Sequence, residues 1–210
     1  MDSQKDTIFI IDDDRSVRRS LSLFLMSHDY LVETYSGSEE YLTREPYDGT
    51  GCIILDVNLE GKSGLELQEE LLNLGSYLPI IFITGRGNIK MSVQTLKKGA
   101  VNFLEKPFGD EELLQSVEEA LCRCKELITG RAEVINAQRL VNLLTPRESE
   151  VLKHIISGML NKQIAYVLGI AEHTIKLHRH SICEKLGVKS LPEIIHIADK
   201  AGIKPSEKIL

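Results

Sequence analysis

The sequence has 210 residues, of which 42% are hydrophobic and 27% charged. That length suits two domains, and this composition lets each of them bury a core. No apolar run approaches the roughly 18 to 20 residues of a membrane span, and the N-terminus lacks the basic and then apolar order of a signal peptide, so we expect a cytoplasmic protein with no membrane partner.

The cysteines and the charges divide the possible functions further. Cys52, Cys122, Cys124 and Cys183 form no C-x-x-C pair, which argues against a zinc site or a disulfide framework and favours reduced cysteines in the core. Residues 1–124 carry 12 Lys and Arg against 22 Asp and Glu, whereas residues 125–210 carry 13 against 9. The second part is therefore the one that we expect to bind a polyanion.

Short apolar runs alternate with amphipathic segments of helical length through residues 1–124. Five such strand and helix pairs indicate an α/β fold, a doubly wound five-stranded parallel sheet. The expected strands are residues 7–11, 31–35, 52–56, 79–84 and 101–105, and the expected helices are residues 16–26, 38–44, 65–74, 89–98 and 110–122.

Polar side chains end four of these strands. Asp12 and Asp13 follow the first strand, and Asp56, Thr84 and Lys106 follow the third, fourth and fifth. In a doubly wound sheet in which the first, third and fourth strands lie together, these ends converge on one crevice. Clustered carboxylates repel each other unless a cation lies between them, and a hard divalent ion prefers oxygen ligands. A carboxylate beside such an ion can attack phosphorus and form an aspartyl phosphate, whose oxygens the lysine and threonine would contact.

This arrangement resembles the flavodoxin-like receiver domain of two-component response regulators, over residues 6 to about 124. The resemblance implies that Asp56 is the phosphoacceptor and that a histidine kinase is the phosphodonor. It also implies an Mg²⁺ cofactor held by Asp12, Asp13, Asp56 and the backbone carbonyl of Asn58. The residues that carry it are Asp12-Asp13, Asp56, Thr84-Gly85, Gly99-Ala100 and Lys106-Pro107-Phe108, in the order and spacing of the family.

Further roles follow from the same resemblance. Lys106 would contact the phosphoryl group, and the peptide bond before Pro107 would be cis. Thr84 and Phe103 occupy the switch positions of the family, although a buried core phenylalanine would also explain Phe103. Phosphorylation would then change the face formed by residues 89–122.

One residue departs from the family pattern. Glu60 stands where receivers usually have proline, but Gly61 and Gly64 remain, so we expect the loop after Asp56 to keep its shape. The side chains of Asn58 and Arg86 lie at positions that tune the rate of phosphoryl hydrolysis in receivers.

A phosphohydrolase of the haloacid dehalogenase type is an alternative for this half. Asp12 and Asp14 form a D-x-D pair after a strand, and a later Thr and Lys also fit that family. Against it, Ser16 stands where Thr or Val is expected, and Asp56 would have no role. We therefore expect no enzyme activity beyond phosphoryl transfer and hydrolysis on the chain itself.

Short helices replace the alternating pattern in the rest of the chain. Residues 125–143 contain no strand-like run and are predicted to be a linker, helical in part. Thr145 is a predicted N-cap, with Pro146 at the first helical position and Glu148 in the first turn. The further helices are expected at residues 161–168, 172–186 and 190–201, giving an all-α domain of four helices at 144–203 and a loose tail at 204–210.

The two middle helices of this set predict a helix-turn-helix. The second helix has a polar face that bears Lys176, Arg179, His180 and Lys185, and such a helix fits the major groove of B-DNA. The apolar positions that the two helices share are Ile164, Ala165, Leu168, Ile170, Ile175 and Ile182.

Residues 144–202 resemble the LuxR-type helix-turn-helix of the FixJ/NarL group, on the segments L-T-P-R-E-S-E-V-L, G-M-L-N-K-Q-I-A, T-I-K-L-H-R and K-L-G-V-K-S. The resemblance implies that Lys176, Leu177 and His180 approach base edges. It also implies phosphate contacts from Asn161, Lys162, Thr174, Arg179 and Lys189.

Together the two halves predict a phosphorylation-controlled, sequence-specific DNA-binding transcription regulator, with activation as the expected outcome. The expected partners are double-stranded DNA, a histidine kinase, a second copy of the chain when phosphorylated, and RNA polymerase. A constitutive DNA-binding protein, whose receiver works without phosphorylation, is the remaining alternative.

Overall fold

The computed structural model describes residues 5–85, 95–96 and 98–206. The chain divides into two compact units, Met1–Ile128 and Thr129–Leu210, here named the N-terminal and C-terminal units. Helix α5, Asp110–Val141, runs from one unit into the other without a break. The second part of this helix coincides with most of the predicted linker, and the domain boundaries stay a prediction.

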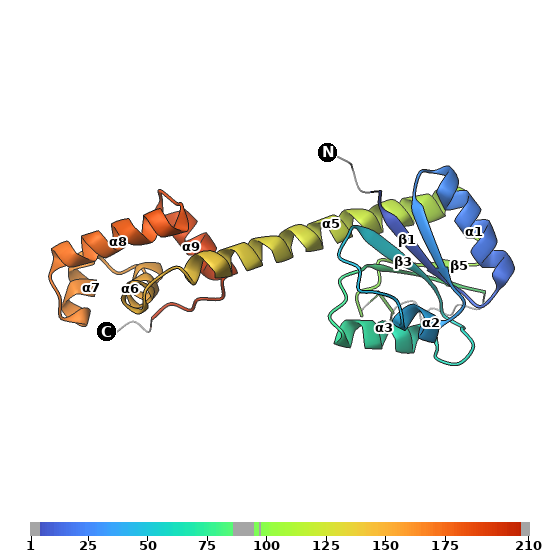
Figure 1. Ribbon diagram of the computed structural model, residues 1–210, viewed down its shortest axis with the longest axis horizontal. Coiled ribbons are helices and arrows are strands. Elements are labelled where there is room, and N and C mark those ends of the chain that lie inside the picture. Colours follow the sequence, from blue (N-terminus) through green and yellow to red (C-terminus); the bar gives the residue numbers. More distant parts are fainter. Residues whose placement is uncertain (1–4, 86–94, 97, 207–210) are drawn as a thin grey trace. The chain divides into compact units, whose positions relative to one another are not determined.

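A parallel sheet forms the centre of the N-terminal unit, with the strand order β2-β1-β3-β4-β5 (Figure 1). All residues of β1, β3 and β4 are buried, as expected for inner strands with helices on both faces. This confirms the doubly wound five-stranded sheet, including the adjacency of the first, third and fourth strands. The strands are β1 (Thr7–Ile11), β2 (Leu31–Tyr35), β3 (Gly51–Asp56), β4 (Ile80–Thr84) and β5 (Asn102–Glu105).

Helices cover both faces of this sheet. Helices α1 (Arg15–Ser27) and α5 pack on one face, and α2 (Ser38–Leu42) and α3 (Gly64–Asn73) pack on the other (Figure 1). Because side chains alternate along a strand, Ile8 and Ile10 enter the core on one face, while Phe9 and Ile11 enter the core on the other.

Helix caps fix where the helices next to the sheet edge begin. The Asp14 side chain accepts hydrogen bonds from the backbone N–H groups of Ser16 and Val17, so Asp14 is the N-cap of α1. Ser63 and Glu66 form a reciprocal capping box at the start of α3. Both helices therefore start close to the residues that end β1 and β3.

The C-terminal unit is all α, and its helices match the expected set closely. Its core contains the shared apolar positions predicted for the two middle helices, with Ile164, Ile175 and Ile182 fully buried. Gly169 ends α7 in the left-handed region at φ 63°, where a residue without a Cβ is favoured. The helices after α5 are α6 (Pro146–Ile156), α7 (Asn161–Leu168), α8 (Glu172–Leu186) and α9 (Leu191–Lys200).

Three local expectations have different outcomes. The helix predicted at 89–98 falls mostly outside the described residues, although Thr95 and Leu96 are helical. Cys122 is exposed, so it is not the core residue that we expected, whereas Cys52 and Cys124 are buried. The tail is not loose at Ser206, which hydrogen-bonds to the end of α6.

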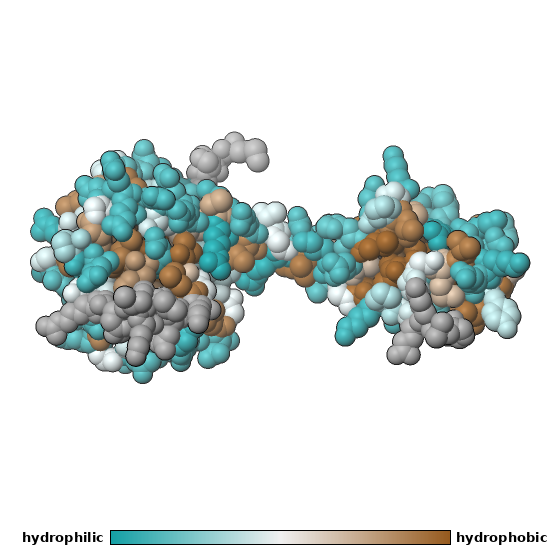
Figure 2. All heavy atoms as spheres, turned by 180° about the vertical axis from the view of Figure 1, so that it is seen from behind, coloured by the Kyte–Doolittle hydropathy of each residue, from teal (hydrophilic) through white to brown (hydrophobic). Residues whose placement is uncertain are grey.

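The described surface is mostly hydrophilic, with hydrophobic atoms reaching it in patches (Figure 2). Within residues 5–85, 95–96 and 98–206, no helix combines the length and the apolar character that crossing a membrane requires.

Candidate functional site

Three of the predicted site residues meet at the carboxyl edge of the sheet. The Nζ atom of Lys106 lies 2.6 Å from Oδ2 of Asp12 and 3.0 Å from Oδ1 of Asp56. The side chains of Asp12 and Asp56 are only 1% and 7% exposed, and that of Lys106 is 24% exposed. One ammonium group thus bridges two buried carboxylates that come from neighbouring strands.

The electrostatics of this cluster follow from burial and from the bridge. Burial raises the pKa of Asp12, and the hydrogen bond from Lys106 offsets only part of this rise. Burial alone would lower the pKa of Lys106, but its hydrogen bonds to Asp12 and Asp56 outweigh burial and raise the pKa. Lys106 therefore stays charged and provides the positive charge that the carboxylates need.

The backbone of the strand ends completes the hydrogen bonding of both carboxylates. The N–H of Asp14 donates to Oδ1 of Asp12 at 2.8 Å, and the N–H of Asn58 donates to Oδ2 of Asp56 at 2.9 Å. The bond between Lys106 and Pro107 is cis, as the resemblance implied.

Thr84 lies buried at the end of β4, within reach of the loop after Asp56. The amide nitrogen Nδ2 of Asn58 donates to Oγ1 of Thr84 at 3.1 Å. Phe103 pairs with Phe82 in the register of β4 and β5, and side chains of paired residues share a face of the sheet. Thr84 lies two residues after Phe82, so Thr84 and Phe103 also share that face, where Phe103 is partly buried against the core.

Glycine preserves the loop in which Glu60 replaces the usual proline. A Cβ atom on Gly64 would lie 2.2 Å from the carbonyl oxygen of Asp56, so only glycine fits there. The N–H of Gly64 donates to the carbonyl of Val57 at 3.1 Å and closes the loop. Glu60 itself is exposed, so water solvates its charge.

The residues at this edge fit a cation only in part. Asp12 and Asp56 already direct oxygen atoms at one positively charged group, and oxygen is the ligand type that Mg²⁺ requires. Asp13, in contrast, is exposed. Among the described residues, no three His, Cys, Asp or Glu side chains lie together as a ready set of metal ligands. An Mg²⁺ site would thus need Asp13 or a backbone carbonyl to complete it.

Helix α8 presents the residues that were expected to reach base edges. Lys176, Leu177 and His180 are all exposed, with Leu177 57% exposed. Lys176 and His180 each lie near a glutamate one turn away on the same helix, at 3.4 and 3.5 Å. These pairs are exposed and therefore weak, so the side chains can exchange them for a nucleic acid.

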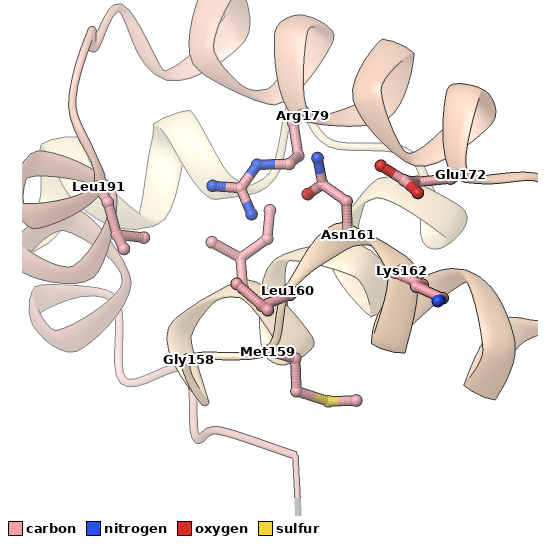
Figure 3. Close-up of a pocket in the computed structure, with 9 residues that line it drawn as sticks. Gly158, Met159, Leu160, Asn161, Lys162, Glu172, Arg179 and Leu191 are labelled. Atoms are coloured by element: carbon pink, nitrogen blue, oxygen red, sulfur yellow. The ribbon is translucent and has the colours of Figure 1, made fainter.

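Three of the five predicted phosphate contacts line one cleft, of about 510 Å³, between α7, α8 and the start of α9. In Figure 3, the side chains of Asn161 and Arg179 lie near each other at this cleft, with Lys162 on its rim. Thr174 is half-buried on α8 and Lys189 is exposed after it, and neither lines this cleft.

The structure corrects the position of Lys185. We placed this side chain on the polar face of α8 with the DNA-facing cations, but its Nζ atom lies 2.6 Å from Oε2 of Glu148, a residue of α6 that is only 5% exposed. Lys185 is therefore held by a buried carboxylate of its own unit, with its side chain 32% exposed. Helical periodicity predicts on which side of its own helix a residue lies, but it does not predict which residue of another helix it contacts.

The sequence did not reveal several contacts at these sites. The bond from Asn58 to Thr84 and the bond from Arg18 Nη1 to the carbonyl of Asp12, at 2.5 Å, join residues on different elements. The T-P-R-E segment signalled Thr145 as the N-cap and Glu148 as an acid in the first turn, but it signalled neither their reciprocal capping box nor the contact of Glu148 with α8.

Comparisons with known proteins agree with both halves of this description. Residues 8–118 match the model of the response regulator receiver domain, and residues 142–198 match that of the luxR family of bacterial regulatory proteins. Nodulation protein W of Bradyrhizobium diazoefficiens is 41% identical over 201 residues, which is 96% of this chain and 88% of that protein. Transcriptional regulatory protein FixJ of Azorhizobium caulinodans is 36% identical over 202 residues, with 95% of each chain covered.

A solved structure of the response regulator StyR is similar over nearly the whole chain. It is 42% identical, with a TM-score of 0.81, and the match covers 94% of this chain and 100% of that one. These relatives and the receiver match leave the phosphohydrolase alternative without support. The chain therefore belongs to the two-component response regulators that join a receiver domain to a LuxR-type DNA-binding domain, and it is a transcription regulator of the FixJ/NarL type.

Proposed function

We propose that this regulator is switched at Asp56, whose carboxylate accepts a phosphoryl group from a histidine kinase. The observation that carries the proposal is the bridge of Lys106 between Asp12 and Asp56. It holds a cation beside a carboxylate whose other oxygen is fixed by the N–H of Asn58. A positioned nucleophile beside a fixed positive charge is the arrangement that phosphoryl transfer needs.

In the reaction, one oxygen of Asp56 forms a bond to phosphorus while the bond from phosphorus to the imidazole nitrogen of the kinase histidine breaks. The leaving imidazole takes a proton from solvent. Lys106 lies where it can neutralise an oxygen of the transferred group. Mg²⁺, held by Asp12, Asp13, Asp56 and the carbonyl of Asn58, would neutralise the charge that gathers on the phosphoryl oxygens.

The response to phosphorylation would pass through Thr84. A phosphoryl group on Asp56 offers an acceptor to the Thr84 hydroxyl, which now lies 3.1 Å from the amide of Asn58. Movement of Thr84 changes the space on the face of the sheet that it shares with Phe103. Phe103 then moves, and the face formed by β5 and its neighbouring helices changes shape.

The output is control of transcription through paired DNA contacts. Two phosphorylated copies bind a split site, with Lys176, Leu177 and His180 toward bases and Asn161, Lys162, Thr174, Arg179 and Lys189 toward phosphates. The net charge of the C-terminal half is small, so one copy alone binds weakly. We propose activation, by presenting a surface to RNA polymerase at the promoter.

Intact mass after incubation with Mg²⁺ and acetyl phosphate tests the acceptor. The wild type should gain the mass of one phosphoryl group, and Asp56→Asn should gain none. Asp29→Asn, a change at an exposed loop carboxylate, is the matched control and should be modified like the wild type. Phosphorylation of Asp56→Asn would show that another residue is the acceptor.

Beryllofluoride, a phosphoryl mimic, separates the switch from the constitutive alternative. We expect it to convert monomer to dimer in sedimentation experiments and to raise affinity for DNA. Equal oligomeric state and equal affinity with and without the mimic would favour a receiver that works without phosphorylation.

A further inference from the structure

Glu148 is a nearly buried carboxylate of the C-terminal unit, and its role extends beyond its own helix. It lies in the first turn of α6 and is 5% exposed. Its Oε2 atom accepts the backbone N–H of Thr145 at 2.7 Å, which is one half of the capping box. A capping box needs no more than this, and Gln serves it as well as Glu.

The other bonds of this carboxylate go to the recognition helix. Oε1 of Glu148 accepts the Ser181 hydroxyl at 2.6 Å, and Oε2 accepts the Lys185 ammonium at 2.6 Å. Ser181 and Lys185 are one turn apart and so lie on the same side of α8. Ser181 directly follows His180 and lies one turn after Leu177, two of the residues proposed to face bases.

These bonds lower the pKa of the carboxyl group. Burial alone would raise the pKa of Glu148, but the hydrogen bonds from Lys185, Ser181 and Thr145 lower it to about 2. The group is therefore ionised at neutral pH, and its bonds are charge-assisted, short and directional.

The neighbouring residue holds the other helix of the pair. Nη2 of Arg147 donates to the carbonyl of Leu168, the last residue of α7, at 3.0 Å. Two consecutive side chains in the first turn of α6 thus reach both helices of the helix-turn-helix.

Burial of its apolar face sets the rotation of α8 about its axis only coarsely. The apolar contacts of Ile175, Ile182 and Leu186 are buried but non-directional. A pair of directional bonds from one carboxylate to one side of the helix sets that rotation.

We propose that Glu148 is a positioning residue for DNA recognition, which fixes the rotation of α8 and thereby aims its base-facing side chains. The proposal rests on the DNA contacts of α8 proposed above. The carboxylate of Glu148 also accepts the N–H of Thr145, which lies four residues after the end of α5 at Val141. Glu148 therefore links α8 to the segment that follows α5.

The test uses the full chain and the double variant Glu148→Gln/Lys185→Met, which keeps the capping box and the net charge but removes the charged tie. The matched control is Asp199→Asn, at an exposed carboxylate of α9. The probes are the duplex that the wild type selects from a random-sequence pool and a scrambled duplex. Affinity for each is measured over a range of salt concentrations, together with thermal unfolding.

We expect the double variant to unfold close to the wild type and to bind the selected duplex at least tenfold more weakly. Its affinity for the scrambled duplex and its salt dependence should be unchanged. Ser181→Ala, which removes one bond and no charge, should lose several-fold in selective affinity even if the double variant is less stable.

Wild-type selectivity in both variants would overturn the positioning role. A salt slope reduced by about one would also overturn it, because Lys185 would then contact phosphate itself. If the wild type selects no sequence from the pool, the proposed DNA recognition is wrong. If the wild type selects a sequence and both variants bind it equally well, only the positioning role of Glu148 is wrong.

Discussion

Removal of Lys106 is the sharpest test of the electrostatics at the sheet edge. The change Lys106→Met leaves the carboxylates of Asp12 and Asp56, 1% and 7% exposed, without their shared cation. Removing one partner of a buried ion pair costs about 3 to 5 kcal/mol. Lys106 is itself 24% exposed, so water reaches the cluster, and we expect the lower end of that range, about 3 kcal/mol in the free energy of unfolding.

Urea unfolding with and without Mg²⁺ measures this effect. A ligand that binds only the folded chain stabilises it by about 2.7 kcal/mol at one hundred times its dissociation constant. We expect Mg²⁺ to stabilise the variant more than the wild type, because the ion replaces the missing positive charge. Lys98→Met is the matched control: Lys98 pairs with Glu69 where both side chains are about half exposed, and its loss should cost less than about 1 kcal/mol.

Two results would refute this reasoning. The first is a Lys106→Met variant no less stable than Lys98→Met. The second is an Mg²⁺ effect that is equal in the wild type and in Lys106→Met, since the ion would then not share the carboxylates with the lysine.

Three further predictions concern other parts of the chain. The pKa of Glu148 is lowered from 4.5 to about 2, so its contribution to the free energy of unfolding is complete above pH 4.5 and is lost as pH falls toward 2; acid unfolding followed by circular dichroism should show this loss, and Glu148→Gln should not. Gly64→Ala should cost about 1 to 3 kcal/mol and slow modification by acetyl phosphate, because the new methyl group meets the carbonyl of Asp56; Gly130→Ala, with open space around it, should do neither. Arg179→Ala should weaken binding to selected and scrambled duplexes alike and reduce the salt slope by about one, and an unchanged slope would argue against a phosphate contact.

The core of the candidate site could be predicted because it depends on strand ends. Apolar runs that end in Asp12, Asp56 and Lys106 identify parallel strands, and the ends of adjacent parallel strands meet at one edge. The sequence pattern therefore predicted that Lys106 lies near Asp56 and Asp12, which are 50 and 94 positions away in the chain. The same pattern says nothing of a single exposed side chain, which is why it did not reveal that Asp13 faces solvent.

Contacts between helices were harder to predict. Lys185 carries the same charge as Lys176 and Arg179 on α8, and only the fold shows that it contacts Glu148, a residue of α6 that lies 37 positions earlier. The end of α5 was also missed, because the apolar stripe that packs on the sheet stops near Cys124. The helix continues to Val141 because its last turns pack on the core of the C-terminal unit, where Ala137 is buried and Leu140 and Val141 contact that core.

The position of Lys106 after the last strand of the sheet has a consequence for when the switch can work. β5 is an edge strand, and the lysine that follows it lies 94 residues from Asp12. Contacts between such distant residues form only after the intervening chain has closed into place. A growing or partly opened chain in which β5 is undocked carries Asp56 without its lysine. If Asp56 is the acceptor, a kinase phosphorylates efficiently only those copies in which β5 is docked. Incompletely folded copies then do not respond to the signal.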